Sequence, residues 1–372
     1  MVFGVVLILL VIGSVLFHFL SPWYLTPLAS NWSIIDTTLD ITFWVTGVVF
    51  VAINLFMAWC VLKFRYRKDR RAHYEPENKK LEIWLTVITS IGVAAMLTPG
   101  LYAWAQFVNP PEDADLVEVI GKQWQWSYRF PGEDGMLGTI DSRHISAANP
   151  FGINPDDPRG QDDVLVASNE VHLPIDRPVK LLLRSQDVLH DFAVAQFRVK
   201  MDLVPGLVTY IWLTPTVVGK YDVLCEELCG VGHYTMRGHV VIDEETDFKA
   251  WLKTYPTYAQ TVSGVGVEST TAGTSLVEQG RKLAQSRGCL GCHSVDGSAG
   301  VGPTWQGLFG KTETMVDGST VVVDADYLKE SILNPGARVV QGFAPIMPPG
   351  SFSDQELDAI NAYIKDGLGG GS

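Results

Sequence analysis

Hydrophobic residues are concentrated in three long runs near the beginning of the chain. The first, residues 2–20, contains no Lys, Arg, Asp or Glu, and about twenty such residues suffice to cross a lipid bilayer. The other two, residues 41–62 and 81–107, are longer. Together they predict a membrane region over residues 1–110 with two to three transmembrane helices. The number depends on residues 2–20, where the lack of a basic start and of a clear cleavage site favours a retained helix over a secretory signal.

The positive charges predict how these helices are oriented. Eight Lys and Arg residues fall between Lys63 and Lys80, and short basic loops lie on the cytoplasmic side of a membrane. With three helices the amino terminus is cytoplasmic, and the chain after Asn109 is periplasmic. We therefore expect a multi-pass protein of a bacterial inner membrane, in contact with membrane lipid.

From Leu116 onward the pattern changes to short β-branched and aromatic runs separated by Gly, Pro and Asp. Regular short strands of this kind predict a β-barrel or sandwich, here over residues 111–256. A long insertion, residues 132–163, is rich in turn-forming residues and is assigned no chemistry. The expected strands are residues 117–120, 124–130, 164–166, 179–183, 207–213 and 239–242.

The net charge of −13 excludes nucleic acid as a partner, because binding to a phosphate backbone requires a basic surface. An acidic surface instead attracts a basic partner and speeds its encounter at low salt. The five Cys residues form two close pairs and the single Cys60, which lies in an apolar run. This distribution does not indicate a disulfide framework.

One stretch of twelve residues combines two thiols, an imidazole and a thioether: Cys225, Cys229, His233 and Met236. These are ligands suited to copper rather than to calcium or magnesium. Two thiolates can bridge two copper ions, and a second histidine is then needed from outside the stretch. His190, 35 residues before Cys225, is the candidate, and its surroundings predict the end of a strand. A disulfide or a structural zinc site are the alternatives, but the disulfide gives no role to the His and Met residues, and zinc does not favour Met.

The pattern Cys-x-Glu-x-Cys-x-x-x-His-x-x-Met, preceded by Asp-Val-Leu-His, resembles the binuclear CuA centre of cytochrome c oxidase subunit II. The resemblance implies a cupredoxin-like Greek-key β-barrel. It also implies that Cys225 and Cys229 bridge the coppers, that His190 and His233 are terminal ligands, and that Met236 is a weak axial ligand. Glu227 offers its backbone carbonyl to copper by the same resemblance, and its side chain ligates a magnesium ion shared with subunit I.

Two further residues acquire roles from this resemblance alone. Trp124, in Gly-Lys-Gln-Trp, matches the surface aromatic residue that receives electrons from a docked cytochrome, although Lys122 stands where a neutral residue is more usual. Ordinary aromatic core is the alternative for Trp124, and it is the preferred interpretation for Trp126. Glu82, in Leu-Glu-Ile-Trp, matches the residue that marks the start of a proton path into subunit I. Its alternative role is to stabilise a helix N-terminus through the macrodipole.

The last third of the chain predicts a second cofactor domain. Residues 257–274 are small and polar, typical of a flexible linker, and residues 275–366 follow as the domain. Cys289-x-x-Cys292-His293 is the attachment signature of a c-type haem, with His293 as an axial iron ligand. A redox dithiol and half a zinc site are the alternatives.

The order of motifs in this domain resembles an all-α class I cytochrome c. The resemblance makes Met347, in the Pro-flanked segment Ala344–Pro349, the second axial ligand of the haem iron. Met315 is the nearby competitor, but no comparable segment surrounds it. The terminal residues 367–372 have the composition of an artificial linker and are left out of the expected fold.

The whole pattern resembles subunit II of a caa-type haem–copper oxidase with a fused cytochrome c domain. This implies a respiratory electron-input subunit that passes electrons from haem c to CuA and on to haem in subunit I, where O2 is reduced and protons are pumped. Expected partners are subunit I, subunit III and an electron donor such as cytochrome c or another respiratory complex. The alternatives are the electron-input subunit of a CuA-containing nitric oxide reductase and a membrane-tethered electron shuttle.

Overall fold

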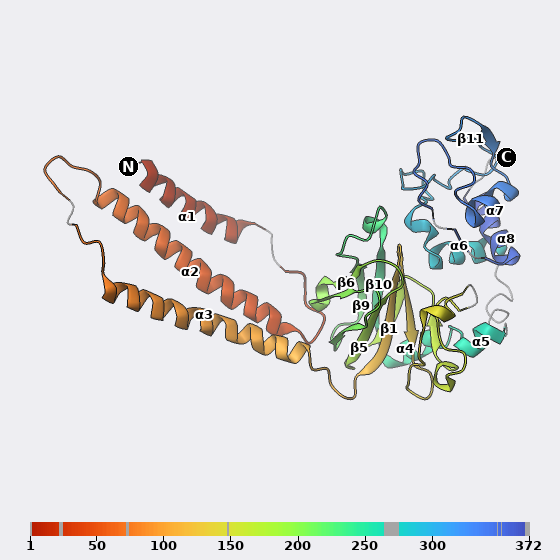
Figure 1. The fold of residues 1–372 in the computed structure, drawn as a ribbon, viewed down its shortest axis with the longest axis horizontal. Coiled ribbons are helices and arrows are strands. Elements are labelled where there is room, and N and C mark those ends of the chain that lie inside the picture. The colour runs from red at the N-terminus through yellow and green to blue at the C-terminus, as the bar shows by residue number, and fades with distance from the viewer. Residues whose placement is uncertain are drawn as a thin grey trace. The chain divides into compact units, whose positions relative to one another are not determined.

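The computed structural model of the chain describes residues 2–21, 25–71, 74–146, 149–263, 275–347, 349–350 and 352–368. Two compact units divide it, Met1–Asn109 and Pro110–Ser372. Figure 1 shows that the first unit is built from long helices, whereas the second combines β-sheets with shorter helices.

The first unit consists of helices α1 (Val2–Leu20), α2 (Ser33–Lys63) and α3 (Lys79–Phe107). All three are long and apolar enough to cross a membrane, which confirms the predicted set of apolar N-terminal helices. Helix α1 packs closely on α2 at Gly4, where an added Cβ atom would lie 2.9 Å from Cγ of Leu62. A glycine at this position therefore lets the two helices approach each other.

Helix α2 begins at Ser33, eight residues before the start of the apolar run that predicted it. The additional turns contain polar residues, and the hydroxyls of Thr37 and Thr38 donate to the carbonyls of Ser33 and Ile34. These hydroxyls thus find hydrogen-bond acceptors within the helix itself. The helix can therefore extend beyond its apolar part. Helix α3 begins at Lys79, after Asn78, whose side chain accepts from the N–H of Leu81.

The β domain of the second unit contains two mixed five-stranded sheets. The first has the order β3-β2-β1-β5-β8 and the second the order β4-β10-β9-β6-β7. Their strands are β1 (Asp115–Lys122), β2 (Gln125–Phe130), β3 (Val164–Val166), β4 (Glu170–Pro174), β5 (Val179–Ser185), β6 (His190–Val194), β7 (Val199–Leu203), β8 (Thr209–Leu213), β9 (Gly219–Leu224) and β10 (Arg237–Asp243).

Alternation along the strands builds the core of this domain. Successive side chains of a strand point to opposite faces, and β5 accordingly buries Val179, Leu181 and Leu183 while the residues between them are partly exposed. Trp126 is fully buried and packs edge-on against Phe192, with ring centroids 5.4 Å apart. Trp126 is therefore an aromatic core residue, as interpreted from the sequence.

Two predictions about the strands near the copper motif were wrong. Trp124, expected to open a strand over residues 124–130, lies instead in the turn between β1 and β2. His190 is the first residue of β6, not a residue at the end of a strand. In both places the backbone changes direction within a continuous run of aromatic or aliphatic residues. The sequence pattern therefore does not show where the strand begins or ends.

A buried ionic network fixes the base of the long insertion. The guanidinium of Arg129 donates to Glu118 and to Asp163, each at 2.7 Å, and also to the carbonyl of Gly138. Arg184 donates to the second oxygen of Glu118. Glu118, Arg129 and Asp163 are all almost fully buried. The charges of two acidic and two basic side chains thus compensate one another. These side chains come from β1, β2, β5 and the end of the insertion.

Short helices continue the second unit after the barrel strands. They are α4 (Glu245–Leu252), α5 (Tyr258–Ser263), α6 (Leu276–Ser286), α7 (Ala325–Leu333) and α8 (Asp354–Ala362), followed by a π-helical turn at Tyr363–Gly367. A small hairpin of β11 (Thr312–Thr314) and β12 (Thr320–Val322) lies between α6 and α7. The C-terminal domain is therefore mostly helical, and the hairpin departs from the expected all-α fold.

The structure alters the expected ends of this domain. Helix α5 lies within the predicted linker 257–274, and the N–H of Tyr258, a buried residue, donates to the carbonyl of Asp163. Residues 264–274 lie outside the described residues. Leu368 packs against the C-terminal hydrophobic core, so residues 367 and 368 belong to the fold rather than to an artificial tail.

Candidate metal centre and haem site

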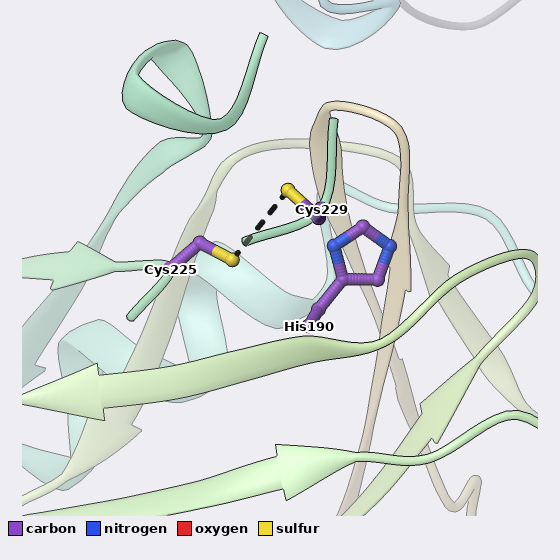
Figure 2. Close-up of side chains that lie close together, drawn as sticks. All are labelled: His190, Cys225 and Cys229. Atoms are coloured by element: carbon purple, nitrogen blue, oxygen red, sulfur yellow. Dashed lines mark hydrogen bonds between the residues drawn. The ribbon is translucent and has the colours of Figure 1, made fainter. Parts of the chain in front are cut away.

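The copper motif occupies the loop between β9 and β10. Strand β6 pairs with β9 through Ala193 and Leu224, and this pairing brings His190, at the start of β6, beside Cys225, which follows β9. The ligand atoms of His190, Cys225 and Cys229 all lie within 4.8 Å of one another. Figure 2 shows these three side chains converging from two separate segments of the chain.

The other residues of the motif surround this group. The sulfur atoms of Cys225 and Cys229 are 3.8 Å apart. Nδ1 of His233 lies 3.6 Å from the sulfur of Cys229, and the buried thioether of Met236 lies 4.0 Å from the same sulfur. The backbone carbonyl of Glu227 is 3.3 Å from the sulfur of Cys225. The structure therefore gathers all six residues of the predicted copper site.

The two thiols differ strongly in acidity. Burial alone would raise the pKa of Cys225, but the nearby imidazole of His190 and the backbone of Asp191 outweigh burial and lower that pKa to about 6. Burial and the adjacent Cys225 thiolate raise the pKa of Cys229 to about 12. One thiolate thus forms at neutral pH by itself. The second requires a nearby positive charge, which a coordinated metal ion supplies.

His190 has one ring nitrogen engaged and one free for a metal. Its Nε2 atom lies 2.8 Å from Oδ1 of Asp187, whereas its Nδ1 atom is buried and has no hydrogen-bond partner. A carboxylate at Nε2 favours the tautomer that carries the proton there and leaves the lone pair on Nδ1. Its hydrogen bonds with His190 and with the N–H of Gln123 lower the pKa of Asp187 despite burial, so this carboxylate is charged at neutral pH.

The donor set fits copper better than the two alternatives considered for it. A disulfide requires the sulfur atoms to be about 2.05 Å apart, far less than the distance between Cys225 and Cys229. Structural zinc takes four Cys, His or carboxylate ligands and leaves no role for the buried thioether of Met236. Two thiolates, two imidazoles and a thioether are the soft and borderline donors that copper favours.

Trp124 lies directly against the copper loop. Its indole N–H donates to the carbonyl of Cys229 at 3.3 Å. Its ring covers Gly232, where an added Cβ atom would lie only 2.4 Å from Cδ2 of the indole. A glycine at position 232 therefore permits this contact. Trp124 is half-buried in the described structure, between the expectations of a surface ring and of a core residue.

The two acidic residues that were given roles by resemblance lie in different units. Glu227 follows Cys225 by two residues in the copper loop, and its side chain is half-buried. Glu82 lies in the first turn of α3 and is exposed. Its position suits the macrodipole role, because a carboxylate stabilises a helix N-terminus.

The haem motif lines a cavity in the second unit. Cys289, Cys292, His293 and Met347 all contribute to its wall. Nδ1 of His293 lies 2.8 Å from the carbonyl of Pro303, and its ring stacks on Trp305 with centroids 5.1 Å apart. Both contacts fix the ring and leave Nε2 as the nitrogen for iron. Burial lowers the pKa of His293, which keeps the imidazole neutral and able to act as a ligand.

The competing methionine is placed in the hydrophobic core. Met315 is buried, and its sulfur lies 3.9 Å from the hydroxyl of Tyr327. Met347 is 37% exposed, in contrast, and faces the cavity that His293 also lines. This difference favours Met347 over Met315 as a ligand, in agreement with the Pro-flanked segment around it.

Sequence analysis missed two residues of the copper site, Asp187 and Gln123. Asp187 precedes His190 by three residues, and its place in Asp-Val-Leu-His was the one available signal. The side chain of Gln123 donates to the carbonyl of Cys229 at 2.8 Å, across 106 residues of sequence. No local pattern predicts such a contact, because it depends on how the β1–β2 turn meets the copper loop.

Known proteins resemble both parts of the second unit. Residues 116–244 match the family described as cytochrome C oxidase subunit II, periplasmic domain, and residues 277–367 match the cytochrome c family. The alternative cytochrome c oxidase subunit 2 of Bradyrhizobium diazoefficiens is 58% identical over 259 residues, which cover 70% of this chain and 94% of that protein.

Two further similarities are more distant. The cytochrome c oxidase subunit 2 of Alkalihalophilus pseudofirmus is 24% identical over 326 residues, which cover 85% of this chain and 82% of that protein. Among solved structures, the periplasmic domain of subunit II of cytochrome oxidase from Bradyrhizobium japonicum covers 39% of this chain and 96% of its own, with 26% identity and a TM-score of 0.29.

Proposed function

The chain belongs to the cytochrome c oxidase subunit II family and carries a cytochrome c domain, and from this premise we propose that it is the electron-input subunit of a proton-pumping haem–copper oxidase. Electrons pass from haem c to the binuclear copper centre and on to haem in subunit I, where O2 is reduced to water. The observation that carries the proposal is the convergence of His190, Cys225 and Cys229 within 4.8 Å.

The copper ligands are assigned residue by residue. Cys225 and Cys229 would hold the two copper ions through their thiolates, with His190, through Nδ1, and His233 as the imidazole ligands. Met236 and the carbonyl of Glu227 are the weak ligands. The bound copper pair supplies a one-electron carrier whose charge change is spread over two ions. The chain supplies the deprotonated sulfur of Cys225, the tautomer of His190 and the water-excluding wall around them.

The haem is held covalently by Cys289 and Cys292. His293 and Met347 would ligate its iron, a pair that raises the reduction potential and suits an electron carrier. Stacking of His293 on Trp305 and its contact with Pro303 hold the imidazole in one orientation. Trp124 is the residue at which electrons reach the copper loop, which its direct contact with Cys229 supports.

The remaining assignments concern the membrane and the partners. The protein is anchored in the inner membrane of a bacterium with its copper and haem domains in the periplasm, and it contacts lipid, subunit I and subunit III. Its donor is cytochrome c or another respiratory complex. Glu82 collects protons for subunit I, and the side chain of Glu227 ligates a magnesium ion shared with that subunit. The domains span residues 1–110, 111–263 and 275–368.

Purification of the full chain with its partners tests the proposal. We expect two copper ions and one covalent haem per chain, an electron paramagnetic resonance signal spread over two coppers, and an a-type haem that co-purifies. The variant Cys225→Ser should lose the copper signal and keep the covalent haem. Cys60→Ser is the matched control, because Cys60 lies in helix α2, in the other unit of the chain, and should leave the signal unchanged.

Zinc in place of copper, or a single copper ion per chain, would contradict the proposed centre. Co-purification of another catalytic subunit without a-type haem would retain the centre but reject the oxidase. The two results separate the assignment of the site from the assignment of the complex.

A further inference from the structure

The turn that carries Trp124 donates two hydrogen bonds to one backbone atom of the copper loop. The carbonyl oxygen of Cys229 accepts from the side-chain amide of Gln123 at 2.8 Å and from the indole of Trp124 at 3.3 Å. The shorter hydrogen bond is the better formed of the two, because N–H···O distances cluster near 2.9–3.0 Å. Gln123 therefore provides the stronger link between the turn and Cys229.

The backbone of Gln123 connects the same turn to the other side of the copper site. Its N–H donates to Oδ2 of Asp187 at 2.7 Å, and the other oxygen of that carboxylate lies 2.8 Å from Nε2 of His190. Gln123 thus lies between the partner of His190 and the carbonyl of Cys229. Three segments distant in sequence, the β1–β2 turn, the start of β6 and the copper loop, are joined through this residue.

The copper loop is shaped to receive this turn. An added Cβ atom at Gly230 would lie 2.9 Å from the side-chain nitrogen of Gln123 and 3.3 Å from the ring of Trp124. Gly230 also has a φ of +117°, which disfavours other residues. Side chains at positions 230 and 232 would therefore block the contact between the turn and the copper loop. Because both residues are glycines, the amide of Gln123 can reach the carbonyl of Cys229.

We propose that Gln123 is a positioning residue that holds the Trp124 indole against the copper loop and so sets the rate at which electrons reach the copper centre. The inference rests on the proposed function, in which Trp124 receives electrons from haem c. In this step haem c loses one electron and the copper centre gains it, and no bond is made or broken. The alternative is that Gln123 only stabilises the turn.

The test compares variants of the full chain loaded with copper and haem. Gln123→Leu removes the side-chain donor, retains the backbone N–H to Asp187 and has a similar volume. We expect unchanged copper content and a rate of electron transfer from haem c to copper that falls several-fold, because tunnelling slows as the indole moves away from the copper loop. Flash photolysis measures this rate within one molecule. Gln161→Leu is the matched control, because the side-chain amide of Gln161 donates to the carbonyl of Pro155 in the long insertion.

A double-mutant cycle separates positioning from turn stability. If Gln123 acts through the indole, Gln123→Leu should slow transfer in the parent protein and add no further slowing to Trp124→Ala. Additive slowing, an unchanged rate in Gln123→Leu, or loss of copper from both Gln123→Leu and the equally long Gln123→Met would overturn the positioning role. An unchanged rate in Trp124→Ala would instead reject the role of Trp124 in the proposed function.

Discussion

Replacement of Asp187 by Asn tests how the copper site selects the free nitrogen of His190. Both oxygens of Asp187 accept hydrogen bonds in the structure: Oδ1 from Nε2 of His190 and the N–H of Val188, and Oδ2 from the N–H of Gln123. Asparagine offers one acceptor oxygen and one NH2 donor. In either orientation of the amide, a donor therefore faces another donor.

The two orientations have different consequences, and both weaken the site. If the NH2 group faces His190, the ring must accept at Nε2 and carry its proton on Nδ1, the atom needed by copper. If the NH2 group faces Gln123, the turn that holds Trp124 is displaced. A hydrogen bond with a charged partner contributes about 1.5–3 kcal/mol, which corresponds to roughly 10- to 150-fold in a binding constant.

Copper affinity is the appropriate measurement, because loss of such an outer partner typically weakens metal binding 10–100-fold. Competition with a chelator, followed by the visible spectrum of the copper centre, yields the affinity of each variant. Asp247→Asn is the control, since it removes one exposed carboxylate of the same domain and changes the net charge equally. Equal affinities and spectra for Asp187→Asn and the parent protein would refute the assignment of the tautomer to Asp187.

Three further predictions concern other parts of the chain. Met347→Ala should leave the haem attached and lower its reduction potential, because the iron loses its thioether ligand; an unchanged spectrum and potential, with Met136→Ala as control, would place the ligand elsewhere. Glu82→Gln should slow oxygen turnover and leave transfer from haem c to copper intact, measured against the control Glu77→Gln; full turnover would leave Glu82 only its helix-terminal role. Burial raises the pKa of Asp163 from 3.8 to about 6, although Arg129 opposes the rise, so the protonated form is favoured by the fold. The stability of the parent protein, measured relative to Asp163→Asn by thermal unfolding at each pH, should therefore fall as pH rises from 3.8 through 6. A difference in stability that stays constant with pH would contradict the raised pKa.

The candidate ligands of both cofactors could be proposed from the sequence because their motifs are largely local. Cys225, Cys229, His233 and Met236 occupy one loop, and Cys289, Cys292 and His293 occupy five consecutive positions. Only His190 required knowledge of the sheet, since its approach to Cys225 depends on the pairing of β6 with β9. The soft character of the donors made a distant histidine a reasonable candidate before this pairing was known.

Strands β4, β7 and β9 of the β domain escaped prediction because polar residues interrupt them. Strand β7, for example, alternates buried Val199 and Leu203 with exposed Lys200 and Asp202, and the short run lacks the aromatic residues that mark β2. The opposite error occurred at Trp124, where a continuous aromatic run concealed a turn. Sequence pattern records the preference of each residue, whereas the end of a strand depends on where the backbone turns to meet its neighbour.

The contacts of Gln123 and Asp187 could not be predicted at all. Their hydrogen bond joins residues 64 positions apart, and the bond from Gln123 to Cys229 spans 106 positions. Neither residue type is unusual in a turn, so composition gives no signal. Contacts that support metal ligands from other segments are a property of the assembled fold, and they become visible only with its coordinates.

The ionic network under the insertion has a consequence for how this protein can evolve. Loss of the charge of Glu118 or Arg129 leaves an uncompensated partner in a site closed to water, which costs far more than the pair itself contributes. Glu118 and Arg129 are both almost fully buried, so neither water nor a charge at the surface can replace a lost partner. Substitutions at positions 118, 129, 163 and 184 should therefore be inherited in compensating combinations, so that related chains keep the whole set or replace it together with apolar residues.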